Sequence, residues 1–290
     1  MNQPEIKPII DKAKILVEAL PYIQKFNGKT VVIKYGGNAM TDDKLKLEVM
    51  EDIALLRLVG VKVVLVHGGG PEISGMMTKL GKKTEFIDGL RVTDRETVDI
   101  VQMVLAGKVN KSLVAMLEQL GTAAAGISGM DGKLIEAEMK DERLGYVGNI
   151  KKINIGIVND LLENNYIPVI STLGFDKSGN IYNINGDTAA AYIAGAIGAK
   201  RLILMTDIAG VMLDRDDPST LIRNMTISDA HKLREQNVIS GGMIPKVQCC
   251  IDAISKGVDK VIIMDGRVHH SILMELLTDE GAGTMVKRDV

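Results

Sequence analysis

Two lysines stand next to glycine pairs at widely separated places in the sequence. Lys34 precedes Gly36-Gly37, and Lys246 follows Gly241-Gly242. Glycines allow the backbone to approach a ligand closely, and their exposed N–H groups suit phosphate oxygens. Lysine ammonium groups bind phosphate as point charges. These residue types in this pattern indicate chemistry on a phosphoryl group.

The position of Lys246 strengthens this interpretation. Pro245 suits the first position of a helix, which would place Lys246 in the first helical turn. The helix dipole disfavours a cation there. A nearby anion would explain the lysine, and the alternative is an ordinary lysine on a solvated surface.

A second glycine cluster, His67-Gly68-Gly69-Gly70, follows an apolar run. Each glycine cluster taken alone could be a simple turn. Gly28-Lys29-Thr30 imitates the end of a P-loop, but Ile23 stands where that motif requires glycine. No G-x-G-x-x-G follows a strand, so the motifs of P-loop enzymes and protein kinases are absent. His67 is interpreted as a structural residue.

The segment 183–188 (NINGDT) is unusually polar and leads directly into an alanine-rich run. Asn185 or Asp187 could cap the helix that begins there. A cap explains one of these polar residues but not all of them. The remainder are candidates for ligand contacts.

Apolar runs and periodicity predict the elements that position these residues. Strands are expected at 30–35, 61–66, 166–171, 201–206 and 260–264, and helices at 8–25 (interrupted by Pro21), 43–59, after Pro71, and at 94–120, 156–164, 186–197, 228–236 and 244–256. Hairpins are expected within 123–150, with a tight turn at Asp131-Gly132, and at Asp176 to Asn180. Strands alternating with helices predict an α/β fold whose mostly parallel sheet is covered on both faces. Ligands in such folds bind beyond the carboxyl ends of the strands, where both glycine clusters lie.

Composition narrows the class of protein. Net charge is −2 over 290 residues, which gives no reason to expect nucleic acid or a membrane surface as a partner. Cys249 and Cys250 are adjacent and are expected to be buried on a helix, and four histidines without ligand spacing argue against zinc. The N-terminus lacks the apolar region of a signal peptide, and no apolar run approaches the roughly 20 residues needed to span a bilayer. We therefore expect a cytoplasmic protein.

The order of segments resembles the amino-acid-kinase family over residues 30–290. The resemblance rests on six strings: VVIKYGGNAM (31–40), LVHGGGP (65–71), GLRVTD (89–94), YNINGDTAAAYIA (182–194), LMTDIAGV (204–211) and GGMIPKV (241–247). Aspartokinases, uridylate kinases and carbamate kinases share the fold and some glycine loops. GLRVTD together with NINGD favours the branch that phosphorylates N-acetyl-L-glutamate.

The resemblance implies a three-layer αβα sandwich in two lobes. Residues 1–25 would form an N-terminal helix for oligomerisation or regulation, 26–197 a lobe that binds acetylglutamate, and 198–290 a lobe that binds ATP. The implied reaction transfers the γ-phosphoryl of ATP, with Mg²⁺, to the side-chain carboxylate of N-acetyl-L-glutamate, a step of arginine biosynthesis.

The resemblance also implies roles for residues. Lys34 and Lys246 would stabilise the transition state, and Asp187 would position both. The substrate would contact Gly69, Gly70, Arg91 and Asn183. The nucleotide would lie near Gly36, Gly37, Thr206, Asp207, Gly210 and Met243.

These residue types suit the implied reaction. A carboxylate nucleophile is already ionised at neutral pH, so no general base is required. The task is to bring it against an anionic phosphoryl group, which calls for positioning and positive charge. Arg91 can grip a carboxylate through two parallel hydrogen bonds, which lysine cannot.

Residues 1–25 and 267–286 resemble the arginine-inhibited members of that branch. L-Arginine is therefore an expected feedback inhibitor, with His270, Glu280 and Gly283 as candidate contacts. The expected assembly is a homo-oligomer, either a hexamer built as a trimer of dimers or a dimer. The alternatives are a family member that uses aspartate or carbamate, and a non-catalytic domain that senses arginine.

Overall fold

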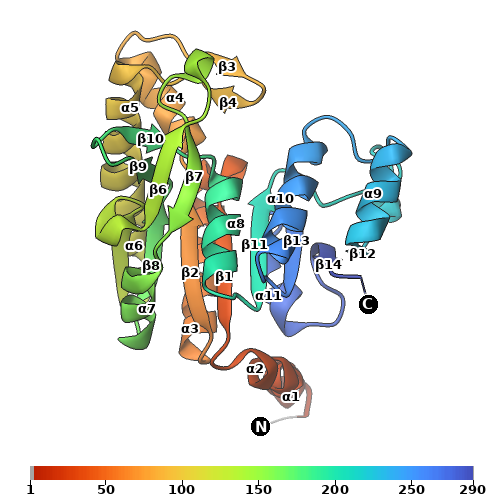
Figure 1. Cartoon of the computed structure of the whole chain (residues 1–290). Coiled ribbons are helices and arrows are strands. Elements are labelled where there is room, and N and C mark those ends of the chain that lie inside the picture. Colours follow the sequence, from red (N-terminus) through yellow and green to blue (C-terminus); the bar gives the residue numbers. More distant parts are fainter. Residues whose placement is uncertain (1–2, 290) are drawn as a thin grey trace.

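The chain folds around one eight-stranded sheet with helices on both faces (Figure 1). The computed structural model describes residues 3–289. The strand order is β12-β14-β13-β11-β1-β2-β8-β5. These strands span Thr30–Tyr35 (β1), Lys62–His67 (β2), Ala124–Ser128 (β5), Ile167–Ser171 (β8), Arg201–Thr206 (β11), Asn224–Thr226 (β12), Lys260–Asp265 (β13) and Gly283–Lys287 (β14).

Six neighbouring strands of this sheet run parallel, from β13 through β11, β1, β2 and β8 to β5. Only β14 and its parallel neighbour β12 run the other way, because β14 pairs antiparallel with β13. The carboxyl ends of the parallel strands therefore meet at one edge. The predicted α/β class with a mostly parallel sheet is confirmed.

The strands are apolar on both faces because both faces are covered. Val31 and Ile33 of β1 belong to one core cluster and Val32 belongs to the other. This alternation follows from the two-residue period of a strand. The chain has no tryptophan, and its core is built mainly from fully buried valine, isoleucine, leucine and methionine side chains.

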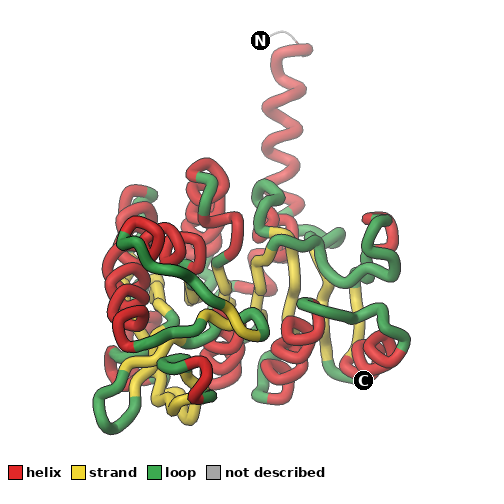
Figure 2. Tube along the Cα trace, turned by 90° about the horizontal axis from the view of Figure 1, so that it is seen from above, coloured by secondary structure: helices red, strands yellow, loops and turns green. Residues whose placement is uncertain are grey.

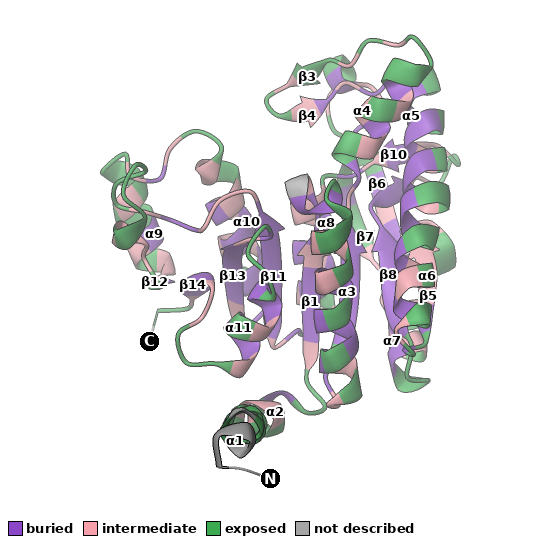
Figure 3. Ribbon diagram, turned by 180° about the vertical axis from the view of Figure 1, so that it is seen from behind, coloured by how far each residue is buried: buried purple, intermediate pink, exposed green. Residues whose placement is uncertain are grey.

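Helices form the outer two layers. One face carries α3 (Asp43–Leu58), α4 (Gly70–Lys79), α5 (Arg95–Gln102), α6 (Asn110–Gln119) and α11 (Ser271–Leu277), and the other carries α7 (Gly156–Glu163), α8 (Gly186–Ala196) and α10 (Met243–Ser255), with α9 (Ile227–Glu235) packed beside α10 and β12. Figure 3 shows the buried sides of α3 and α11 turned toward the strands. Asp42 caps α3, as Thr41-Asp42 predicted, by accepting from the N–H groups of Lys44 and Leu45.

A smaller sheet lies over the N-terminal half of the molecule. Its order is β10-β9-β6-β7, with β6 at Ile135–Met139, β7 at Gly148–Ile153, β9 at Leu173–Phe175 and β10 at Ile181–Asn183; a two-stranded ribbon joins β3 (Phe86–Ile87) to β4 (Leu90–Arg91). The hairpin prediction for 123–150 is only partly right. The pair β6 and β7 is antiparallel, but β5 belongs to the main sheet, and Asp131-Gly132 lies in a 3₁₀ turn. Short alternating segments do not reveal which sheet a strand will join.

The main sheet divides at the boundary between β11 and β1. Strands from residues 30–171 form one half, and strands from 201–287 form the other. Helix α8 contacts both β1 and β11 and also packs against α10. The proposed lobe boundary near residue 197 follows α8 directly.

One continuous helical stretch, Arg95–Gln119, is long and apolar enough by composition to cross a bilayer. The stretch is not an uninterrupted apolar run, because it contains charged residues such as Asp99, Lys108 and Lys111. Its two α-helical parts pack against α3, α4, β5 and β8. A π-helical turn, Met103–Val109, separates them. The stretch covers one face of the sheet as a core helix does.

The N-terminal helix is split, as Pro21 predicted. Helix α1 spans Gln3–Glu18 and α2 spans Leu20–Phe26. Figure 2 shows α1 extending away from the body of the molecule. Phe26 is buried and anchors the end of α2.

Candidate active site

One carboxylate joins the two lysines that the sequence singled out. Asp187 Oδ1 lies 3.0 Å from Lys34 Nζ, and Asp187 Oδ2 lies 3.2 Å from Lys246 Nζ. All three side chains are largely shielded from solvent. Three distant segments thus converge on one charged centre.

Asp187 is held in its ionised form. Burial alone would raise its pKa, but Lys34 and Lys246 outweigh burial and lower the pKa to about 2. Asp187 also lies in the first turn of α8, where the helix dipole favours negative charge. Two ammonium groups flanking one carboxylate carry a net positive charge, which can meet an anion.

Local structure explains how each member is placed. Lys34 lies near the carboxyl end of β1, and a Cβ on Gly36 would stand 2.9 Å from its ammonium nitrogen. Glycine at 36 therefore leaves the space that the ammonium occupies. Asn185 caps α8 by accepting from the N–H of Thr188, which leaves Asp187 available for the lysines.

The start of α10 differs from the prediction. The helix begins at Met243, so Pro245 is its third residue and not its first. Ser240 and Gly241 carbonyls accept from the first two helical N–H groups, and proline fits a position whose N–H would otherwise lack a helical partner. Lys246 follows in the fourth position and projects from the opening of the helix.

All four residues predicted to bind the substrate line one cavity of about 170 Å³, at the carboxyl end of β2 and the start of α4. Gly69, Gly70, Arg91 and Asn183 line it, together with Phe86 and Thr172. These residues come from the loop after β2, from β4 and from β10. The size suits the end of a small molecule.

Arg91 is fixed before any ligand arrives. Its Nη2 donates to the Gly70 carbonyl at 3.0 Å and to Ser74 Oγ at 2.8 Å. Its guanidinium also stacks on Phe86, with 4.9 Å between Cζ and the ring centroid. Burial lowers the pKa of Arg91 from its usual value. A rigid, partly desolvated guanidinium is well suited to bind a carboxylate.

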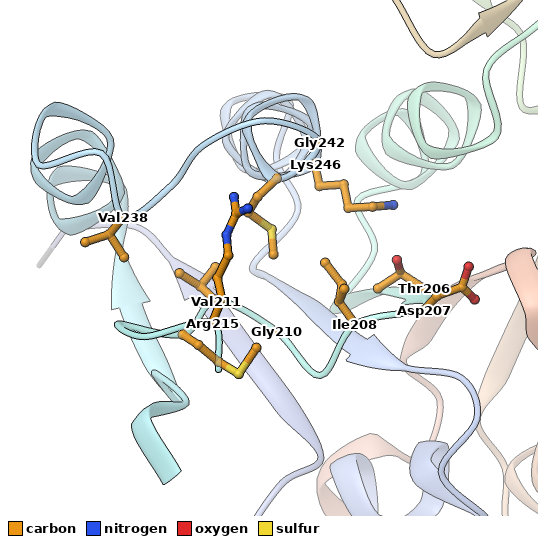
Figure 4. Close-up of a pocket in the computed structure, with 11 residues that line it drawn as sticks. Thr206, Asp207, Ile208, Gly210, Val211, Arg215, Val238, Gly242 and Lys246 are labelled. Carbon is orange, nitrogen blue, oxygen red and sulfur yellow. The ribbon is translucent and has the colours of Figure 1, made fainter. Parts of the chain in front are cut away.

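A second cavity of about 500 Å³ is lined in part by Lys246 (Figure 4). Four of the six residues predicted for the nucleotide line it, Thr206, Asp207, Gly210 and Met243, whereas Gly36 and Gly37 do not. The remaining lining residues are mostly apolar: Ile208, Val211, Met212, Val238 and Gly242, with Arg215. Apolar walls beside cationic side chains fit a heterocycle that carries phosphates.

A third cavity, of about 950 Å³, connects with the charged centre. Asp187, Lys246 and Cys249 line it together with the segments 87–90 and 140–144. Lys246 therefore borders both this cavity and the 500 Å³ cavity, and Asp187 borders this one.

The glycines predicted to contact the nucleotide occupy different surroundings in the structure. Gly37 has φ +75°, and a Cβ there would stand 2.7 Å from Asp207 Oδ1. The Gly36-Gly37 loop thus packs against the rim of the 500 Å³ cavity. Gly210 adopts φ +151° and lies against Thr284, so its position is already accounted for by packing.

Other residues of interest have structural surroundings. Cys249 and Cys250 are buried free thiols on α10, as predicted, and burial raises the pKa of both thiols. Cys249 Sγ donates to the Asp187 carbonyl at 3.2 Å. Within residues 3–289, no group of three or more His, Cys, Asp or Glu side chains could hold a metal ion.

The three residues proposed for arginine lie near the C-terminus. His270 Nδ1 lies 2.7 Å from Asp52 Oδ1 of α3. The carbonyl of Glu280 accepts from Arg223, and Tyr22 of α2 hydrogen-bonds to the neighbouring Asp279. Gly283 is buried at the start of β14, where a Cβ would collide with the Ile263 carbonyl. Their role in binding arginine remains a prediction.

Sequence reasoning missed three functional candidates. Arg215 carries no motif signal, because it lies in a loop whose position only the fold decides. Ser74 follows the glycine cluster at helical spacing and holds Arg91. Asn110 lies within the long, largely apolar helix expected at 94–120. A polar amide at a position expected to be buried is the signal that could have identified it.

Comparison with known proteins agrees with this geometry. The profile of the Amino acid kinase family matches residues 29–265. N-acetylglutamate synthase from Neisseria gonorrhoeae, solved with coenzyme A and N-acetyl-glutamate, has a TM-score of 0.83 at 26% identity. The alignment covers 96% of this chain but only 64% of that longer chain. The fold and the lysine–aspartate centre define a phosphotransferase, and the chain belongs to the amino acid kinase family.

The curated relatives are more specific. The chain is 54% identical over 281 residues to acetylglutamate kinase from Brachyspira hyodysenteriae, covering 96% of this chain and 98% of that one. It is 52% identical over 289 residues to acetylglutamate kinase from Heliobacterium modesticaldum, with the same coverage of both chains. The family resemblance and the kinase class predicted from the sequence are confirmed.

Proposed function

We propose that this chain is an acetylglutamate kinase, which transfers the γ-phosphoryl group of ATP to the side-chain carboxylate of N-acetyl-L-glutamate. The products are ADP and N-acetyl-L-glutamyl 5-phosphate. Full-length relatives at 52–54% identity support the assignment. The structural observation that carries it is the bridge from Asp187 to Lys34 and Lys246. Lys246 lines the 500 Å³ cavity, and Asn185 and Gly186, next to Asp187, line the 170 Å³ cavity.

The reaction needs charge neutralisation more than proton transfer. A carboxylate oxygen of the substrate attacks the γ-phosphorus, and the bond from phosphorus to the β-phosphate bridging oxygen breaks. No proton changes place, because the nucleophile is ionised and ADP leaves as an anion. Lys34 and Lys246 would stabilise the negative charge that spreads over the transferring oxygens.

Asp187 would act as a positioning residue in this step. Its carboxylate sets the directions of both ammonium groups. Its lowered pKa keeps it ionised throughout the physiological range, so it does not serve as a base. Mg²⁺, carried by the nucleotide phosphates, would supply additional positive charge.

Arg91 and Asn183 would hold the acceptor. The Arg91 guanidinium would bind the α-carboxylate, and Asn183 would pair with the acetamido group or the same carboxylate. Gly69 and Gly70 would let the backbone approach the substrate closely. The 500 Å³ cavity would hold the adenosine moiety of ATP, with the phosphates toward Lys246.

A coupled ADP-release assay tests this proposal. We expect turnover with N-acetyl-L-glutamate and little with L-glutamate, L-aspartate or carbamate. Hydroxylamine trapping of the acyl phosphate would confirm that a carboxylate is the acceptor. Preference for aspartate or carbamate would replace the proposed function with that of another family member, and failure to bind ATP would favour a non-catalytic domain.

We also propose that the N-terminal helices mediate assembly and feedback inhibition by L-arginine. Helix α1 exposes large apolar side chains: Ile9, Ile10, Ile15, Leu16 and Val17. An apolar helix face of this kind is a site for association, here with a second copy of the chain. Tyr22 links α2 to the loop that contains Glu280, so arginine bound there could be sensed by the helix.

Gel filtration of the full chain and of a variant lacking residues 1–18 tests the assembly. The full chain is expected to form the larger oligomer, and the truncated chain a dimer. An arginine titration of ATP turnover tests inhibition, with Glu280→Gln expected to weaken it. A full chain that elutes as a dimer and is not inhibited by arginine would refute this part of the proposal.

A biosynthetic enzyme of this kind is expected to act in the cytoplasm.

A further inference from the structure

A buried amide contacts three neighbouring strands of the main sheet, β2, β8 and β5. Asn110 is 1% exposed and is the first residue of α6. Its Nδ2 lies 2.8 Å from the carbonyl oxygen of Val169, 3.2 Å from that of Ile127 and 3.1 Å from His67 Nε2. The two carbonyls fix the amide orientation, because only nitrogen can donate to them.

The same contacts fix the protonation of His67. His67 Nδ1 lies 2.8 Å from the carbonyl oxygen of Gly68 and must carry the hydrogen, since that oxygen can only accept. Nε2 is then bare and accepts from Asn110. Burial lowers the pKa of His67 to about 4, so the ring is neutral at physiological pH.

The Gly68 carbonyl belongs to the same peptide unit as the Gly69 N–H. A trans peptide is planar, so the C=O and the N–H of one unit point in opposite directions. A hydrogen bond that holds the Gly68 carbonyl therefore sets the direction of the Gly69 N–H. Without it, a peptide between two glycines could rotate easily.

The helix that carries Asn110 is also shaped to this loop. The π-helical turn Met103–Val109 ends immediately before Asn110. A Cβ on Gly69 would stand 2.6 Å from Leu105 Cδ2 and 3.4 Å from Val109 Cγ2, so the turn packs directly on Gly69. Isolated π-helical turns occur frequently at functional sites.

Packing alone does not explain the amide. Asn110 Oδ1 is buried and has no hydrogen-bond partner among the described residues, which costs stability. Gly126 lies against this oxygen, and a Cβ there would collide with it. An apolar side chain at 110 would avoid the cost but would leave His67 Nε2 without a donor.

We propose that Asn110 is a positioning residue for the acceptor substrate, acting through the His67 tautomer to orient the Gly69 N–H toward the 170 Å³ cavity. The inference rests on the proposed function, since it concerns the binding of N-acetyl-L-glutamate. Asn110 itself does not line that cavity. Its effect is therefore expected on the acceptor and not on ATP.

The first test uses the unaltered protein. Long-range ¹H–¹⁵N spectra of the imidazole groups report which ring nitrogen carries hydrogen, with the His67 signals assigned by comparison with His67→Gln. We expect His67 to carry hydrogen on Nδ1 and to stay neutral down to about pH 5. A His67 ring protonated on Nε2 alone would overturn the proposal.

The second test changes the donor. Asn110→Asp replaces the donating amide with a carboxylate, which forces Nε2 of His67 to carry hydrogen. We expect the KM for N-acetyl-L-glutamate to rise tenfold or more, while the KM for ATP changes less than twofold. Thr122→Val is the matched control, because it removes a buried polar contact from the far end of the same helix.

The outcomes separate this inference from the proposed function. An unchanged KM for acetylglutamate, or equal rises in both KM values, would overturn the role of Asn110 in an enzyme that is otherwise active. A wild-type protein that does not phosphorylate acetylglutamate would refute the proposed function itself. If Asn110→Asp does not fold, Asn110→Ser serves instead, because the shorter serine side chain cannot reach His67 Nε2. It is expected to give the same selective rise in the KM for N-acetyl-L-glutamate.

Discussion

Asp187 places one carboxylate oxygen 3.0 Å from Lys34 Nζ, although β1 and α8 carry the two residues on different layers of the molecule. The other oxygen meets the ammonium of Lys246. The spacing of the two lysines is therefore set by one side chain.

Replacing Asp187 by asparagine should lower kcat about 10²-fold. The amide keeps the size of the carboxylate but removes the charge that holds two ammonium groups together, so both lysines lose their orientation. Steady-state ADP release measures the effect. Asp43→Asn is the control, because it disrupts an exposed Asp–Lys pair on α3 and should leave kcat unchanged. Full activity in Asp187→Asn would show that the lysines are positioned without it.

Lys34→Ala and Lys246→Ala should each lower kcat about 10²-fold or more. Each removes a donor aimed at the transferring group, and the loss of one such donor typically costs that much. Hydroxylamine trapping of the acyl phosphate gives the rate. Lys44→Ala removes an exposed lysine and serves as the comparison. Wild-type turnover in either variant would exclude that lysine from the mechanism.

Arg91→Lys should raise the KM for N-acetyl-L-glutamate by tenfold or more with a smaller change in kcat. A lysine cannot reproduce the fork that contacts Gly70 and Ser74 and stacks on Phe86. The exposed Arg95→Lys provides a matched change on the next helix. A rise confined to the KM for ATP would show that Arg91 contacts the nucleotide and not N-acetyl-L-glutamate.

Arg215→Ala should raise the KM for ATP several-fold and leave the KM for acetylglutamate unchanged. The side chain lines the 500 Å³ cavity and donates to the carbonyl and hydroxyl of Ser240, next to the start of α10. Its loss removes positive charge and loosens the wall near Lys246. Calorimetric titration with ATP and Mg²⁺ checks this directly. Equal ATP affinity would mean that the cavity is not the nucleotide site.

Asp52→Asn should stabilise the protein increasingly, relative to wild type, as pH rises from 4 to 7. Burial raises the pKa of Asp52 to about 6 despite the contact with His270, so ionisation costs the folded state free energy between the unfolded pKa of 3.8 and 6. Asp52 also raises the pKa of His270, and the stabilisation that results is lost as pH rises above the usual histidine pKa of about 6.5. Both effects have the same sign, and the pKa difference of Asp52 alone corresponds to on the order of 3 kcal/mol.

Urea unfolding at several pH values measures this difference. Glu48→Gln is the contrasting variant, because His269 lowers the pKa of Glu48 and the slope should reverse. A difference between wild type and Asp52→Asn that stays constant from pH 4 to 7 would show that Asp52 titrates normally.

Much of the architecture could be predicted because it depends on local pattern. The apolar runs that form β1, β2, β8, β11 and β13 are continuous and rich in β-branched residues. The N-terminal helix is interrupted next to Pro21, as its sequence predicts. Short elements were harder. The β3–β4 ribbon and the strands β12 and β14 carry too few residues for periodicity to identify them.

The sequence by itself determined the class of protein and the identity of its charged residues, because motif strings and strand runs are local properties of the chain. Only the tertiary structure decided that Asp187 lies between Lys34 and Lys246, that Arg215 lines the 500 Å³ cavity, and that Asn110 contacts His67 Nε2. Those relationships depend on which strand ends adjoin at one edge of the sheet and on where a helix shifts register through a π-helical turn. Neither is written in the spacing of residues along the chain, since both arise from packing between segments that are distant in sequence.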